Sequence, residues 1–286
     1  MKTLFQNISI LLLLTTSLLT AKDINPHQLH PFERDNGYFF SQFNTVNKAF
    51  FYLFNDDKEA LKTILDTKTF DPLEETKVLW GRTDGMNNGT YSLLSAAIHD
   101  EKLYAVQMIV ESLTQQQLQS EYLQMMLYHS GGHKNLEIYH YLLSKNIAPT
   151  YANPYGENLL NYITQYGTQG DVKVLLDAGV SMQCGAKNNS ITTAMYAHHY
   201  DTALYLFKHY PCDVNQQLDE NYFPSYLFHL HEVNTEKKED MELANYLFNT
   251  MSAEHLNTFG KLFLERLQKH NPKLYEIAMK HPRLNP

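Results

Sequence analysis

The chain has 286 residues, of which 43% are hydrophobic and 19% are charged, a composition that supports a substantial core and excludes an intrinsically disordered protein. Its formal net charge is -8, and its longest run of basic residues is the pair Lys237-Lys238, which argues against nucleic acids and anionic membranes because both are bound through concentrated positive charge. Ten Pro and 12 Gly are few for this length, and no run of alternating β-branched residues is bounded by turn signals. A mainly helical fold is therefore favoured.

Residues 1–21 have the features of a secretory signal peptide. Lys2 supplies the positive start, Ile8 to Leu14 the apolar stretch, and Leu19-Thr20-Ala21 a cleavage site. The apolar stretch is too short to span a bilayer comfortably, so an uncleaved anchor is the less favoured alternative, and no Cys follows it to carry a lipid. Residues 22–37 are polar, contain two prolines and are expected to form an irregular lead-in.

From residue 38 to residue 286 the chain repeats one pattern: a short apolar helix, a turn, a second apolar helix that ends in an apolar pair, and a polar linker. The pattern is clearest between Gly156 and Gln216. The apolar pairs are Ile64-Leu65, Ile109-Val110, Leu142-Leu143, Leu175-Leu176, Leu206-Phe207, Leu247-Phe248 and Ile277-Ala278. The steps between Ile109, Leu142, Leu175 and Leu206 are 33, 33 and 31 residues. Longer steps on either side predict insertions, one of them a solvent turn at 231–240.

These units resemble the ankyrin repeat, whose period is about 33 residues. Thr192 to Ala197 matches its first helix and Val172 to Gly179 its second, whereas the T-P-L-H tetrapeptide is nowhere intact. The resemblance implies an all-α, ankyrin-like solenoid of stacked helix-turn-helix repeats that occupies residues 38–286, with capping units at 39–70 and 256–281.

Ankyrin-like proteins bind partners through the hairpin tips and the outer end of the first helix, on the concave face. The resemblance therefore implies partner-binding residues in each clear repeat, and the alternative is that they are ordinary solvent positions or tyrosines half-buried between repeats. The tips would be Asn88, Tyr91, Tyr155, Glu157, Asn189 and Ile191, and the helix ends His99, Asp100, Gln165, Tyr166, His199 and Tyr200.

The two cysteines, Cys184 and Cys212, lie in the linkers that end two successive repeats. In an oxidising compartment two thiols can pair, and the sequence leaves open whether they form a disulfide or stay separate.

A search for catalytic motifs gives no candidate active site. His231-Glu232-Val233-Asn234-Thr235 begins like a zinc-protease helix but has Thr where the second His must stand. The sequence has no G-x-S-x-G elbow, Walker A loop or G-x-G-x-x-G turn. The histidine pairs 129/133, 198/199 and 229/231 lack a nearby Cys or carboxylate at metal-ligand spacing. We therefore expect neither metal nor cofactor.

What remains is recognition: a non-catalytic, protein-binding protein, exported and favoured to reside in the bacterial periplasm. Exported bacterial ankyrin-like proteins resemble either immunity proteins that neutralise a cognate toxin, such as a type VI secretion lipase effector, or accessory proteins that support a periplasmic enzyme or stress response. A secreted effector that acts on host proteins, and an enzyme with an unfamiliar helical fold, are the remaining alternatives.

Overall fold

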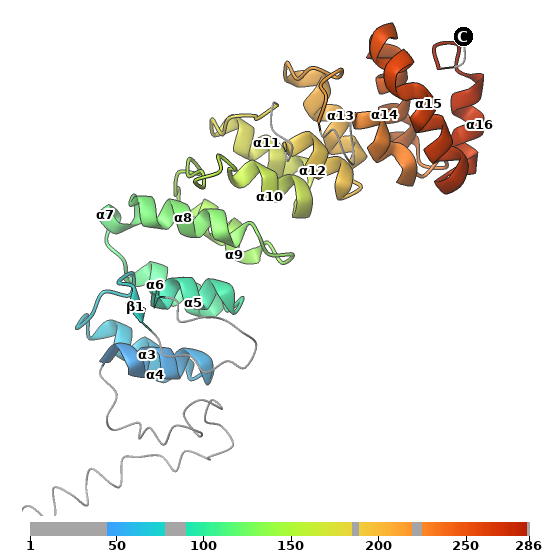
Figure 1. Ribbon diagram of the computed structural model, residues 1–286. Helices are drawn as coiled ribbons and strands as arrows, with labels where there is room; N and C mark the ends of the chain where they lie inside the picture. The colour runs from blue at the N-terminus through green and yellow to red at the C-terminus, as the bar shows by residue number, and fades with distance from the viewer. Residues whose placement is uncertain (1–44, 78–89, 185–188, 219–224, 285–286) are drawn as a thin grey trace, which may run out of the picture. The chain divides into compact units, whose positions relative to one another are not determined.

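The computed structural model describes residues 45–77, 90–184, 189–218 and 225–284, and these residues are mostly helical (Figure 1). The predicted signal peptide, the lead-in and Asn88 lie outside them. The described strands are short: β1 (Thr76–Lys77) pairs antiparallel with β2 (Thr90–Tyr91). No helix in the described ranges is both long enough and apolar enough to cross a membrane.

The chain divides into two compact units between Leu113 and Thr114, where the sequence analysis expects one continuous repeat domain. The helices of the first unit are α3 (Thr45–Phe54), α4 (Lys58–Asp66), α5 (Leu93–His99) and α6 (Leu103–Ser112). Within it α3 packs on α4 and α5 on α6, and these pairs stack because α4 also contacts α6 and α3 contacts α5.

The second unit begins with α7 (Gln115–Leu118) and continues as helical pairs in chain order (Figure 1). Its other elements are α8 (Glu121–Ser130), α9 (Glu137–Ser144), α10 (Leu159–Tyr166), α11 (Gln169–Asp177), α12 (Ser190–Tyr196), α13 (Tyr200–His209), the 3-10 helix η3 (Tyr226–Glu232), α14 (Lys238–Thr250), α15 (Ala253–His270) and α16 (Pro272–Lys280). The pairs stack through like helices: α10 contacts α12, α12 contacts η3, α11 contacts α13 and α13 contacts α14.

Four of the described pairs begin their first element at a buried polar residue. Ser92, Asn158, Asn189 and Ser225 are the N-caps of α5, α10, α12 and η3, and all are at most 5% exposed. Each side chain accepts a backbone N–H of the first helical turn, which has no carbonyl partner inside the helix. Equivalent positions in these four repeats can therefore be found by counting residues from the cap.

The first residue of each predicted apolar pair from Ile64-Leu65 to Leu247-Phe248 is buried, and the last pair, Ile277-Ala278, is the exception. Ile277 is 38% exposed and its neighbour Ala278 is fully buried, so the prediction is wrong by one residue in α16. The C-terminal segment, for which the sequence shows no hairpin signature, nevertheless folds as a helical pair of α15 on α16. Asn271 caps α16 and Pro272 occupies its first turn, which is the local signal for this start.

The predicted solvent turn at 231–240 is shorter than expected. η3 extends to Glu232, and α14 begins at Lys238. Asp240, expected in the turn, is 6% exposed, and its carboxylate accepts the backbone N–H of Asn234 at 3.0 Å.

Candidate partner-binding surface

Tyr155 projects from a tight turn that precedes α10. The turn is held by the side chain of Asn153, whose Oδ1 accepts the backbone N–H groups of Tyr155 at 3.0 Å and Glu157 at 2.9 Å. Gly156 adopts φ +81°, a left-handed conformation that suits glycine best, and closes the turn. The Tyr155 side chain is 91% exposed, so the turn presents an aromatic ring to solvent.

The turn is also tied to the preceding helical pair. The Asn153 Nδ2 group donates to Tyr128 Oη at 3.0 Å and to the Glu157 carboxylate at 2.9 Å. Tyr128 belongs to α8, is 4% exposed and packs against the rings of Tyr151 and Tyr162. Burial raises the pKa of Tyr128, which keeps its hydroxyl neutral at physiological pH. We therefore regard Asn153 to Glu157 as a fixed turn, which we call the Tyr155 turn.

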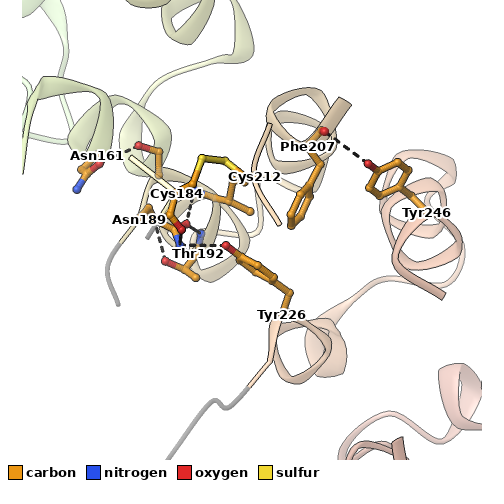
Figure 2. The surroundings of a disulfide bond; sticks show 10 residues. Asn161, Cys184, Asn189, Thr192, Phe207, Cys212, Tyr226 and Tyr246 are labelled. Carbon is orange, nitrogen blue, oxygen red and sulfur yellow. Dashed lines mark hydrogen bonds between the residues drawn. A yellow bond between two sulfur atoms is a disulfide. The ribbon is translucent and has the colours of Figure 1, made fainter. Parts of the chain in front are cut away.

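Asn189 and Ile191 were predicted as the corresponding tip of the next repeat, and this prediction is wrong. Both are fully buried. Asn189 caps α12 through Oδ1, and its Nδ2 group donates to Tyr226 Oη at 3.0 Å (Figure 2). Tyr155 stands three positions before the cap Asn158, and three positions before Asn189 is Ala186, outside the described residues.

In the first unit, the described tip residue Tyr91 is partly exposed and lies in β2 opposite Thr76. The helix-end residue His99 is 39% exposed at its side chain and contacts the Asp100 carboxylate at 3.2 Å. Asp100 itself is mostly covered, at 18% exposure.

The predicted helix ends of the second unit are only partly correct. Gln165 and Tyr166 end α10 and are partly exposed. Tyr200 is 2% exposed, because it begins α13 and packs inward, so it is not a surface residue. His199 is partly buried, and its Nδ1 donates to the carbonyl of Thr164 at 3.0 Å.

Tyr196 is the surface residue that the sequence argument missed. It is 70% exposed at the end of α12. Counting from the N-caps of the first helices would have identified it. The seventh residue after the caps Ser92, Asn158, Asn189 and Ser225 is, respectively, His99, Gln165, Tyr196 and Glu232.

A row of charged and aromatic groups follows Tyr196 onto η3 and α15. His198 Nε2 lies 3.3 Å from the Glu232 carboxylate, which is also 3.5 Å from His231 Nε2. Arg266 Nη2 lies 3.3 Å from the same His231 nitrogen. We call this set, Tyr196, His198, His231, Glu232 and Arg266, the Glu232 edge. It combines an exposed ring with a carboxylate and a guanidinium, which are groups that recognise proteins.

The structure joins Cys184 to Cys212 in a disulfide, which decides the alternative that the sequence left open (Figure 2). The bond links the segment after α11 to the segment after α13, with the two Cα atoms 5.2 Å apart. Asn189 Nδ2 lies 3.5 Å from the carbonyl oxygen of Cys184. The disulfide thus lies beside the N-cap residue of α12.

Within the described ranges no three His, Cys, Asp or Glu side chains are grouped as a metal site would require. No known protein-family model and no curated protein matches the chain.

Proposed function

We propose that the chain is an ankyrin-like solenoid that binds another protein and carries out no catalysis. Three features support the repeat assignment: stacked helical pairs, a buried polar cap at the start of the first helix, and a turn between pairs. The step from α10 to α12 is 31 residues (159 to 190), and the step from α11 to α13 is also 31 (169 to 200). Such stacks hold their core through neighbour contacts and leave the turns free to vary for recognition.

The observation that carries the binding proposal is the exposure of Tyr155. A tyrosine that is 91% exposed contributes little to its own fold, and here it stands on a turn already fixed by Asn153. A preordered aromatic side chain loses little conformational entropy when a partner covers it, and for this reason tyrosine concentrates binding energy in interfaces.

The Glu232 edge supplies a second contact region. Tyr196 is 70% exposed there, and the side chains of His198 and Glu232 are each 54% exposed. Exposed charges at the rim of an interface govern orientation and association rate more than affinity. We therefore assign binding energy mainly to the two tyrosines and selectivity to Glu232 and its neighbour His198.

For the partner, we propose a protein that this chain meets in an oxidising compartment, because a structural disulfide persists there. A cognate antibacterial toxin, such as a type VI secretion lipase effector, is the first candidate, and the chain would act as its immunity protein in the periplasm. The accessory role, support of a periplasmic enzyme, uses the same surface. Both roles are assigned from the ankyrin resemblance and predict a stoichiometric complex.

The test is to purify the mature chain with the product of the neighbouring gene and to measure the dissociation constant and the enzymatic activity of that product. Inhibition at a one-to-one ratio supports the immunity role, and binding without inhibition supports the accessory role. The double variant Tyr155→Ala/Tyr196→Ala should weaken binding by about 10- to 100-fold, since truncating an interface tyrosine typically costs one to a few kcal/mol.

Tyr275→Ala provides the matched control, because Tyr275 is a partly exposed tyrosine on α16 that belongs to neither the Tyr155 turn nor the Glu232 edge. It should leave the dissociation constant unchanged. Equal binding by the double variant and the wild type would show that these tyrosines do not form the interface, and hydrolysis of a substrate by the purified chain alone would contradict the non-catalytic assignment.

A further inference from the structure

The contact between η3 and α15 is lined by histidines. His229 and His231 come from η3, and His255 comes from α15. His229 is 8% exposed, His255 is 7% exposed, and the side chain of His231 is 18% exposed. Three imidazoles shielded from water at one helix contact make its charge state dependent on pH in the range where histidine titrates.

The hydrogen bonds of His231 define its protonation state. Its Nδ1 lies 2.8 Å from the carbonyl oxygen of Phe228, which can only accept, so Nδ1 carries the proton. Its Nε2 faces the guanidinium of Arg266 at 3.3 Å, and a guanidinium can only donate. Nε2 must therefore be the acceptor, and the contact from η3 to α15 requires a neutral imidazole.

A second histidine holds the other end of η3. His255 Nε2 lies 2.6 Å from the hydroxyl of Ser225, the N-cap of η3. This pair is buried, so a charge on His255 would be poorly solvated, although Asp213 and a hydrogen bond to the backbone of Asn215 offset part of that cost. α15 thus contacts both ends of η3, through His255 at Ser225 and through Arg266 at His231.

The charged and titratable groups around the junction are predominantly cationic in acid. These groups come from the turn between α12 and α13, from the start of α13, and from η3, α14, α15, α16 and the segment between η3 and α14. They are His198, Tyr200, Asp240, Arg266, His270, Lys273, Glu232 and Glu236. The Asp240 carboxylate accepts the backbone N–H of Asn234, and the Glu236 carboxylate pairs with Lys273 at 2.8 Å. The Glu232 carboxylate lies near both His198 and His231.

We propose that the η3–α15 junction is an acid-sensitive latch. A proton from solvent adds to His231 Nε2, and the new N–H group then points at the Arg266 guanidinium. The hydrogen bond between Arg266 and His231 is lost, and the two cations then face each other beside the Glu232 carboxylate. The pair α15–α16 is then released from η3, and because Glu232 also pairs with His198, release alters the Glu232 edge.

The direction of the pH effect follows from linkage. Burial, with the nearby Arg266, lowers the pKa of His231, and burial lowers the pKa of His255. Burial, with His231 and Arg266 nearby, lowers the pKa of His229 from 6.5 to about 4. A histidine whose folded pKa is lowered binds protons more readily in the open state, so the closed junction is fully stable above pH 6.5. Stability is lost progressively as the pH falls from 6.5 towards 4.

The experiment is hydrogen exchange on the full chain at pH 7.5 and pH 5.5, with rates corrected for the intrinsic pH dependence of exchange. Amides of α15 and α16 should lose protection at pH 5.5, by up to about tenfold for each histidine that stays neutral in the closed junction. Amides of α10 and α11 should change much less. His231→Gln keeps an acceptor for Arg266 but cannot titrate, so its acid loss should be several-fold smaller.

His140→Gln is the matched control, because His140 is an exposed histidine of α9 that pairs with Asp171 at 2.8 Å outside the junction. It should show the wild-type loss. If His231→Gln lowers amide protection already at pH 7.5, the variant Arg266→Gln is tested in its place. Removing the cation that faces His231 should also reduce the loss of protection at pH 5.5. Equal acid loss in the wild type and in the folded variant, or protection that is unchanged at pH 5.5 in the wild type, would overturn the latch.

Discussion

Asn189 connects two neighbouring elements through one carboxamide. Its oxygen accepts the N–H groups of Ile191 and Thr192 at the start of α12, and its nitrogen donates to the hydroxyl of Tyr226 in η3. Burial is the main reason that the pKa of Tyr226 rises to about 12, so its hydroxyl stays neutral and needs a partner. One side chain therefore caps a helix and satisfies a buried group of the next element.

Asn189→Ala should destabilise the second unit by about 2 to 4 kcal/mol, because it removes the cap and leaves the Tyr226 hydroxyl without this donor. Urea denaturation followed by circular dichroism measures the loss. Tyr226→Phe removes the hydroxyl, so in the double variant the cost of Asn189→Ala should be smaller than in the wild-type background. Strictly additive losses would show that the two side chains are not coupled.

Local signals predicted the paired helices closely. The sequence analysis matches Thr192 to Ala197 to a first helix and Val172 to Gly179 to a second, and α12 and α11 cover Ser190–Tyr196 and Gln169–Asp177. The caps and turn residues that set these bounds are encoded within a few positions of the chain. η3 was not predicted, because a 3-10 helix has no apolar periodicity as distinctive as that of an α-helix.

Surface positions were harder to predict than helices. Tyr155 was placed correctly outside the core, whereas Tyr200, of the same residue type, is buried and Tyr196 was overlooked. The exposure of a tyrosine depends on which neighbouring pair packs over it, and this is a long-range property that the residue's own segment does not encode. The burial of the caps was equally hard to predict, because Asn and Ser suit both a solvent turn and a helix start.

The disulfide should contribute about 3 to 4 kcal/mol, since it closes a loop across a sequence separation of 28 residues. Cys184→Ala/Cys212→Ala should lower the urea midpoint accordingly, while the helical circular dichroism at low urea is retained. Reductant should lower the wild-type midpoint to a similar extent and leave the variant unaffected. A midpoint that is the same in both proteins would mean that the bond adds no stability.

Each of the two compact units has a core of its own, which bears on how the molecule unfolds. The second unit starts at Thr114, whose hydroxyl caps α7 in a capping box with Gln117. We predict that a fragment of residues 114–286 folds alone, with helical circular dichroism and one cooperative urea transition. A fragment without cooperative unfolding would show that residues 1–113 are required for its stability.

The Cys184–Cys212 bond also determines what the cell must provide for this chain to mature. With two cysteines in the sequence, a single intramolecular pairing can form. No shuffling among wrong pairings can trap a monomer, so an oxidase suffices and a disulfide isomerase is dispensable. Production in a reducing cytosol would yield the dithiol form, which a mild oxidant converts to the native bond in one step.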